Sequence, residues 1–165
     1  MSISGLVIGT YLAVLLVLAV YGVHRTALLS MYYRNRHRRP RPAGRFSELP
    51  TVTVQLPLYN EMYVVERLLE AVAGIRYPRD RFQIQVLDDS TDHSAEIARK
   101  AVEEMAAKGY PIKYIHRTNR EGYKAGALAE AMKAATGEFI AIFDADFLPP
   151  KDILHNTIHY FTEDK

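Results

Sequence analysis

The sequence predicts an α/β domain with a mainly parallel sheet and helices on both faces, preceded by one transmembrane helix. Two observations carry this prediction. An apolar run without a single charged residue opens the chain at residues 3–23. From Thr51 onward, strand-like segments alternate four times with segments of helical periodicity. Such alternation is typical of a parallel sheet whose helices pack on its two faces.

The apolar run, residues 3–23, is long enough to cross a bilayer. As a helix, its 21 residues span roughly 31 Å, close to the hydrocarbon thickness of a membrane. A cleaved signal peptide is the alternative. The run lacks a preceding basic region and a clear small-x-small cleavage site, so the membrane helix is favoured.

Residues 24–49 are predicted to form a basic juxtamembrane segment and linker. Seven arginines and no acidic residue lie within residues 24–45, and Pro40, Pro42 and Gly44 mark the linker. Because cytoplasmic flanks are rich in Arg and Lys, we expect the following domain in the cytosol and the N-terminus outside, at the plasma (inner) membrane. The arginines are also expected to contact the anionic head groups of the lipid bilayer.

The composition of the rest of the chain excludes several classes of function. Seven of the 21 Lys and Arg residues precede residue 46, which leaves 14 against all 19 acidic residues. This acidic balance argues against nucleic acid as a partner of the domain. The chain has no cysteine, which excludes disulfides, thiolate metal sites and cysteine nucleophiles.

The elements of the domain, residues 50–165, are expected in the order β-α-β-α-β-α-β-α. Strand-like composition picks out four segments: 51–57, 82–89, 111–116 and 138–145. Helical periodicity picks out four more: 61–75, 92–109, 123–137 and 150–164. In the first helix the apolar stripe consists of Val64, Val65, Leu68, Leu69 and Val72. Gly109 and Gly137 are expected to end the second and third helices.

Charged and amide side chains follow every predicted strand. The carboxyl ends of parallel strands lie along one edge of a sheet, where ligands bind in such folds, so these side chains are expected to meet. Four polar strand ends together predict an active site. They are Tyr59-Asn60-Glu61, Asp88-Asp89, the segment from Arg117 to Lys124, and Asp144 with Asp146.

Asp144 and Asp146 are expected to form a cation site. Two residues apart in extended backbone, their side chains would share a face about 7 Å apart. Mg2+ prefers one or two carboxylates, with substrate phosphates and waters completing its shell. The alternative is a solvated strand end. Phe143 and Phe147 disfavour it, because an apolar setting makes an unpaired carboxylate costly.

Asp88, Asp89 and Lys124 complete the predicted site. Asp92 or Ser94 is expected to cap the next helix, which leaves Asp88 and Asp89 free to accept from a base or from ribose hydroxyls. Lys124 lies at a helix start, where backbone N–H groups and the helix dipole favour phosphate, although a plain surface lysine is equally compatible. Together these residues predict a nucleoside-diphosphate pocket.

Four stretches, "VQLPLYNE", "QVLDDSTD", "GYKAGAL" and "AIFDADFLPP", resemble the front half of a family 2 glycosyltransferase. The resemblance covers residues 50–165 and points to the membrane-bound, cellulose-synthase-like branch, which includes β-glucan and β-mannan synthases. It implies a GT-A (Rossmann-like) fold and inverting, metal-dependent transfer from a nucleotide-sugar donor of the UDP-glucose or GDP-mannose class. The implied cofactor is Mg2+ or Mn2+.

The resemblance also implies a role for each matching residue. Asp144 and Asp146 would bind the metal, and Asp144 the nucleotide as well. Lys124 would contact the diphosphate. The nucleoside would be held by Asp88 and Asp89 and by the pocket residues Pro57, Tyr59, Asn60 and Glu61.

The general base that the resemblance implies is not found. The family's base is an aspartate in a T/S-E-D motif well after the D-x-D motif. Thr162-Glu163-Asp164 starts only 16 residues past Asp146, so we interpret it as a coincidence. The acceptor motif Q-x-x-R-W and later membrane helices are also missing. We therefore expect a fold that is incomplete at the C-terminus, holding the donor site of a longer enzyme and inactive as an isolated fragment.

Three other functions stay open beside a synthase of β-linked polysaccharide. The first is a glycolipid-forming transferase, because a membrane lipid suits a membrane-tethered enzyme as acceptor just as a glycan does. A non-catalytic nucleotide-sugar-binding membrane module is the second. The third is a haloacid-dehalogenase-like phosphatase, since "FDADF" resembles its nucleophile motif. Its place after three β-α units and the bulk of Phe147 disfavour this third function.

Overall fold

The computed structural model of the protein describes residues 2–38 and 40–162. Arg39 of the basic segment and Glu163 and Asp164 of the T-E-D stretch lie outside the described residues. The chain divides into two units, residues 1–41 and 42–165, and each is described by itself.

The first unit contains one helix, α1 (Ile3–Asn35), none of whose residues is buried. Among the described residues it is the one helix that is long and apolar enough to cross a membrane. It is longer than the predicted span of 3–23, since it continues into the basic segment. Between Gly22 and Pro40 the sequence has neither Gly nor Pro, so nothing there breaks the helix.

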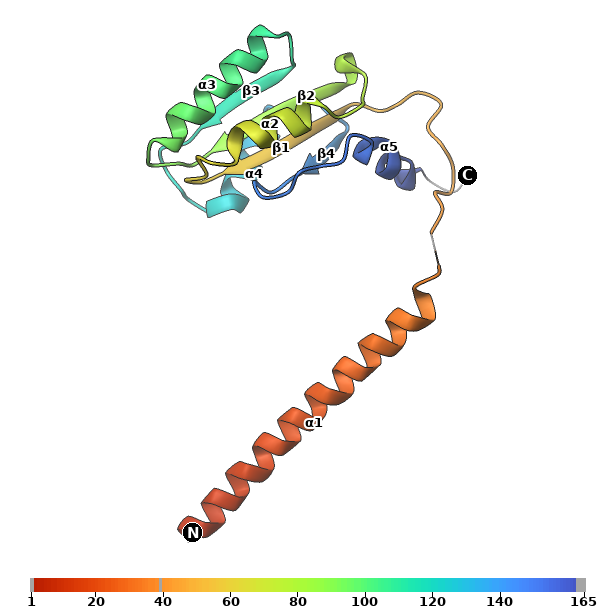
Figure 1. The fold of residues 1–165 in the computed structure, drawn as a ribbon, viewed down its shortest axis with the longest axis vertical. Coiled ribbons are helices and arrows are strands. Elements are labelled where there is room, and N and C mark those ends of the chain that lie inside the picture. Colours follow the sequence, from red (N-terminus) through yellow and green to blue (C-terminus); the bar gives the residue numbers. More distant parts are fainter. Residues whose placement is uncertain (1, 39, 163–165) are drawn as a thin grey trace. The chain divides into compact units, whose positions relative to one another are not determined.

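The second unit is built on a parallel four-stranded sheet with the order β3-β2-β1-β4 (Figure 1). The strands are β1 (Val52–Leu58), β2 (Phe82–Asp88), β3 (Ile112–His116) and β4 (Phe139–Ile142). The helices are α2 (Val65–Ala73), α3 (Ser94–Ala107), α4 (Tyr123–Met132) and α5 (Ile153–Thr157), with short 3-10 turns at Arg79–Arg81 (η1) and Ile158–Phe161 (η2). The predicted alternation of strands and helices is confirmed.

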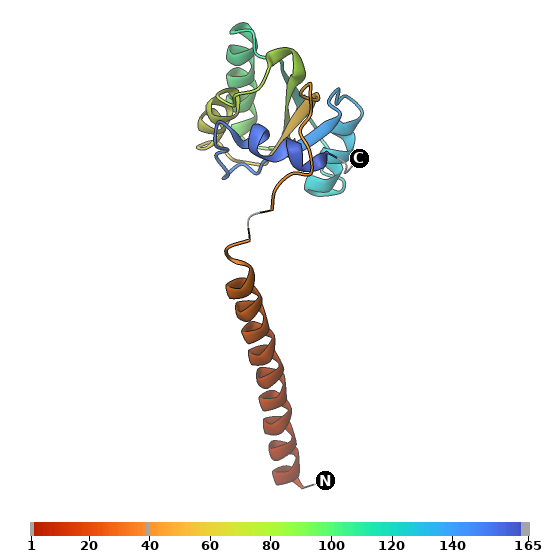
Figure 2. The ribbon, with the colours of Figure 1, turned by 90° about the vertical axis from the view of Figure 1, so that its right-hand side faces the viewer.

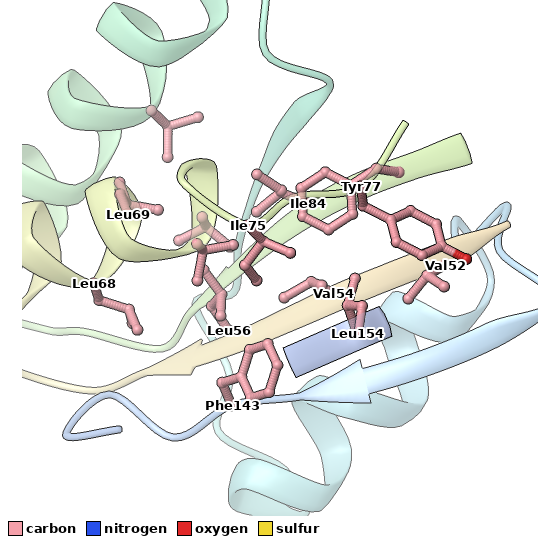
Figure 3. Packing of buried hydrophobic residues seen from close by; sticks show 14 of the residues in the cluster. Val52, Val54, Leu56, Leu68, Leu69, Ile75, Tyr77, Ile84, Phe143 and Leu154 are labelled. Carbon is pink, nitrogen blue, oxygen red and sulfur yellow. The ribbon is translucent and has the colours of Figure 1, made fainter. Parts of the chain in front are cut away.

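Helices cover both faces of the sheet, as predicted. Figures 1 and 2 show α2 and α3 on one side of the strands and α4 on the other. The main core lies under α2, α3 and α5, where side chains from β1 and β2 pack against the stripe of α2 (Figure 3). Leu68 and Val72 are 0% exposed, and burying such a side chain contributes about 1.5–3 kcal/mol.

Apolar and polar residues alternate along β1, and this alternation explains why its two faces differ. Val52, Val54 and Leu56 belong to the main core, whereas Thr53 and Gln55 come between them in the sequence. Successive side chains of a strand point to opposite faces, which places the polar pair on the side of α4. There Gln55 Nε2 donates to Gln85 Oε1 at 2.9 Å across the register of β1 and β2.

Strand β4 is shorter than predicted, because it leaves the sheet before β1 ends. It pairs with β1 only as far as Gln55 and Ile142, whereas β1 continues beside β2 to Leu58. The backbone after β4 then turns, with Phe147 N donating to Asp144 O at 3.0 Å. The sheet therefore opens between the ends of β1 and β4.

Gly137 does not end the third domain helix, contrary to the prediction. Helix α4 ends at Met132, five residues earlier. A Cβ on Gly137 would lie 2.3 Å from Thr53 N. Glycine is needed there because the chain passes against the backbone of β1 as it enters β4.

Candidate active site

A cavity of about 360 Å³ lies at the opening between the carboxyl ends of β1 and β4. This is the point at which the strand order reverses direction, and ligands of open α/β sheets bind at such a point. Its volume falls in the range of small-molecule sites. Seven of the nine residues predicted for the site line it: Pro57, Tyr59, Glu61, Asp89, Lys124, Asp144 and Asp146.

Asp88 is one of the two predicted residues that do not line the cavity. It is 0% exposed and not free, contrary to the expectation from sequence. Its Oδ1 accepts from Ser90 N at 2.9 Å, and its Oδ2 accepts from the hydroxyl of Tyr114 at 2.6 Å. Burial and then this bond raise the pKa of Tyr114 above its ordinary value. Asp88 thus anchors the end of β2 to β3.

Asp89 lines the cavity but is also not free. Arg117 Nε donates to Asp89 Oδ1 at 2.8 Å, and Arg117 Nη2 donates to Asp89 Oδ2. The same guanidinium donates to the backbone carbonyls of Glu121 and Tyr123, at 3.3 and 2.9 Å. Donation to Asp89 raises the pKa of Arg117. One buried arginine therefore ties the end of β2 to the loop that leads into α4.

Asn60 is the second predicted residue outside the cavity lining, and it holds the loop after β1 in place. Its backbone is left-handed, with φ of 55°. Asn60 N donates to Ser90 Oγ at 2.8 Å, and its Oδ1 accepts from Thr91 N at 3.1 Å. Left-handed backbone is uncommon outside glycine and clusters at functional sites. The strained turn places Tyr59 and Glu61 at the cavity.

Lys124 and Asp144 form an ion pair across the cavity, joining the start of α4 to the segment after β4. Both side chains are more than half exposed, at 51% and 61%. The start of α4 is shaped by Gly122, whose φ is 69°, and by Gly126, which lies against the carbonyl of Glu121. Lys124 therefore meets Asp144, one of the two carboxylates expected at this edge of the sheet.

The geometry of Asp144 and Asp146 differs from the prediction. They lie in the turn after β4 rather than in extended backbone, so the spacing of a strand does not apply to them. Both are exposed, and the apolar setting expected from Phe143 and Phe147 is also wrong, because Phe143 points into the core while Phe147 is 45% exposed. Both residues instead line the cavity as exposed side chains.

Oxygen ligands at this corner fit a hard divalent cation. Asp146 makes no hydrogen bond or ion pair with the described residues, so its carboxylate is available. No cluster of three or more His, Asp or Glu side chains that could hold a metal occurs within residues 2–38 and 40–162. Mg2+ and similar ions need only one or two carboxylates when substrate phosphates supply further oxygens. The residues therefore fit an ion that is held jointly with a phosphorylated ligand.

Arg120 lines the cavity, although the sequence did not single it out as a site residue. Its guanidinium carbon lies 3.4 Å from the ring centroid of Tyr59 and 5.3 Å from that of Tyr123. It comes four residues before Lys124, in the loop after β3. From the sequence, Arg120 belongs to the polar segment from Arg117 to Lys124 that was expected at the active site, but nothing in that segment gave it a role of its own.

Comparison with known proteins places the domain among transferases. The family model described as "Glycosyl transferase family 2" matches residues 53–165. The chain is 46% identical over 123 residues to glucomannan 4-beta-mannosyltransferase 1 of Cyamopsis tetragonoloba. That match covers 72% of this chain but only 23% of the relative, so the chain spans about a quarter of its length.

Solved structures agree on the fold. The chain is similar to a mannosyltransferase of Pyrobaculum calidifontis in complex with GDP-Man and Mn2+, with 33% identity and a TM-score of 0.72. That similarity covers 88% of this chain and 43% of the other. It is also similar to S. aureus TarS in complex with UDP, with 27% identity, a TM-score of 0.56, and coverage of 66% and 31%.

Proposed function

Because this chain belongs to glycosyltransferase family 2, we propose that its cavity binds a nucleotide-sugar donor, of the GDP-mannose or UDP-glucose class, for transfer to a glycan acceptor. One observation carries the proposal: Lys124, Asp144 and Asp146 come from two different elements and meet at the switch point of a GT-A sheet. The resemblance to a mannosyltransferase in complex with GDP-Man and Mn2+ supports it.

The diphosphate of the donor would lie at the start of α4. Lys124 is a point charge beside the first backbone N–H groups of a ten-residue helix, and both favour phosphate. In the structure Lys124 pairs with Asp144, so the donor would take over part of the contacts of this lysine. Its charge would then stabilise the nucleoside diphosphate that leaves when the sugar is transferred.

Asp144 and Asp146 would hold Mg2+ or Mn2+ together with that diphosphate. When bound, the ion would neutralise charge on the leaving group. Both carboxylates are exposed to the cavity, and neither is locked into the core. Their place in a turn, rather than in a strand, lets them face the phosphates from one side.

The reaction would proceed with inversion at the sugar. A single displacement by the acceptor hydroxyl, from the face opposite the diphosphate, inverts the anomeric carbon. The hydroxyl must lose a proton to a positioned base. The cavity residues would bind the donor, and none of them is proposed as this base.

The first unit would anchor the domain to a membrane. Helix α1 has the length and composition of a membrane span, and arginines follow it. By the positive-inside rule the domain would then lie in the cytosol, where nucleotide sugars and a growing glycan can reach it. The plasma membrane is the proposed location.

Titration of nucleotide against the full chain in lipid nanodiscs tests the proposal. We expect GDP or UDP to bind more tightly with Mn2+ than with EDTA, and Asp146→Ala to abolish the difference. Glu103→Ala, which removes an exposed carboxylate of α3 outside the cavity, should leave it unchanged. If the wild-type chain binds neither nucleotide with Mn2+ present, the proposal is wrong.

A further inference from the structure

The guanidinium of Arg120 lies flat against Tyr59. At 3.4 Å from guanidinium carbon to ring centroid, a tilted guanidinium would press a nitrogen into the ring, so the two planes must be nearly parallel. Such stacking contributes about 0.5–2 kcal/mol and leaves the N–H groups pointing outward in the plane of the guanidinium. Arg120 therefore presents a fixed fork of donors along the wall of the cavity.

This fork has no acceptor among the described residues. The Nε of Arg120 is buried and has no hydrogen-bond partner there, and no ion pair involves its side chain. The neighbouring cations differ, since Arg117 is bound by Asp89 and Lys124 by Asp144. A buried donor without a partner is costly. Arg120 as a whole is only partly buried and lines the cavity, so a ligand there would meet its terminal Nη groups rather than Nε.

The loops on both sides of Arg120 are fixed. Arg117 holds the carbonyls of Glu121 and Tyr123, and Tyr123 N donates to Arg120 O at 2.9 Å. Tyr123 itself has a left-handed backbone, with φ of 50°. On the other side, Tyr59 precedes the strained turn at Asn60. The fork is thus positioned before any ligand arrives.

We propose that Arg120 is a specificity-determining residue that reads the base of the donor and favours guanine over uracil. The inference rests on the proposed donor site. Arginine matches the adjacent O6 and N7 acceptors of guanine with two parallel hydrogen bonds. Uracil has no such pair, because a donor N3–H separates its two carbonyl oxygens.

The surroundings favour a base rather than a phosphate as the partner of Arg120. The acidic corner at Asp144 and Asp146 and the lysine at the start of α4 already provide for the diphosphate. Arg120 instead lies on Tyr59, which together with Pro57 and Leu58 gives that wall an apolar, aromatic surface. Planar bases pack on aromatic and guanidinium surfaces, whereas a diphosphate has no apolar face.

Binding of GDP and UDP to two variants of Arg120 and one control variant, in the full chain in nanodiscs with Mn2+, tests the inference. We expect Arg120→Gln to weaken GDP binding about tenfold or more and to change UDP binding less than twofold. Arg120→Lys, which keeps the charge but not the fork, should behave like Arg120→Gln. Arg67→Gln, an exposed arginine of α2 outside the cavity, should leave both affinities unchanged.

The nucleotide 7-deaza-GDP, in which a C–H group replaces N7, gives the sharpest readout. The wild-type chain should bind it more weakly than GDP, and Arg120→Gln should bind the two equally. The thermal unfolding temperature of each variant, with the wild type as reference, separates loss of the fork from loss of the fold.

Each contrary result has a distinct meaning. Equal loss of GDP and UDP affinity in Arg120→Gln, with binding retained in Arg120→Lys, would assign Arg120 to the phosphates and overturn base readout. Unchanged GDP affinity would overturn any role in donor binding. A wild-type chain that binds neither nucleotide would overturn the proposed function, and base readout with it.

Discussion

Arg117 Nε donates to Asp89 Oδ1 at 2.8 Å, in an ion pair whose side chains are both only 6% exposed. The pair joins the end of β2 to the loop before α4, under the cavity that would hold the donor. The stability of the fold around a buried ion pair depends on both partners being present. When one partner is removed, the remaining charge is buried without compensation.

Arg117→Met is therefore expected to lower the free energy of unfolding by about 3–5 kcal/mol. The matched control is Arg76→Met, because Arg76 and Asp152 form an exposed pair with side chains 69% and 50% exposed. That substitution should cost less than about 1 kcal/mol. Urea denaturation of the two variants measures the difference, and equal losses would contradict a structural role for the buried pair.

Tyr114→Phe is expected to destabilise the domain by about 1–3 kcal/mol at neutral pH, because it removes a donor from the fully buried Asp88. Urea denaturation measures this loss. Tyr110→Phe serves as the control, since the Tyr110 ring lies against Arg79 and its hydroxyl donates to no buried carboxylate within residues 2–38 and 40–162.

The contribution of Tyr114 should also depend on pH. Its folded-state pKa is raised above the ordinary value near 10, first by burial and then by its bond to Asp88. The folded state therefore retains a proton that the unfolded state loses as pH rises above about 10, so stability falls there. Unfolding free energies measured from pH 8 to pH 11 should fall less steeply in Tyr114→Phe than in the wild type. Equal slopes would contradict this assignment.

Gly126→Ala is expected to disturb the start of α4. An added Cβ would lie 1.9 Å from the carbonyl oxygen of Glu121 and 3.0 Å from Arg117 Nη1. We expect a loss of about 1–3 kcal/mol in stability, together with weaker GDP binding. Gly44→Ala is the control, since its Cβ would make only ordinary contacts, at 3.5 Å from Thr162 Oγ1. If Gly126→Ala has the same unfolding temperature and the same GDP affinity as Gly44→Ala, the start of α4 can move to fit the added methyl group, and the expectation is wrong.

Lys124→Gln is expected to weaken GDP binding about tenfold while leaving the weaker binding of guanosine unchanged, because only GDP carries the diphosphate. Lys113→Gln, an exposed lysine of β3, should change neither affinity. Isothermal titration with both ligands measures the effect. A parallel loss of guanosine affinity would place Lys124 at the nucleoside instead.

The order of elements and most of the cavity could be predicted, because each depends on a short pattern. Alternation in β1 and the stripe of α2 determine which faces are buried. The motifs after the strands placed Tyr59, Lys124 and Asp144 at one edge. Parallel topology alone brings such strand ends together, whatever the details of the loops.

The remaining details depend on contacts between distant residues. Asp88 and Asp89 looked free because Tyr114 and Arg117, which bind them, lie on the neighbouring strand and its loop. Strand β4 looked longer because its apolar composition continues past the point where pairing with β1 stops. The stacking of Arg120 on Tyr59 joins two loops far apart in the sequence, and no local pattern encodes it.

The strand order also determines when each strand can find its pairing partner as the chain is synthesised. Strand β1 is among the first parts of the domain to be made, yet one of its edges stays unpaired until β4 has been made and Val52 meets Phe139. Exposed edges of this kind recruit strands from other molecules. A nascent chain halted before Phe139 would therefore carry an apolar strand with an open edge, and pairing with β4 covers that edge of β1 from Val52 to Gln55.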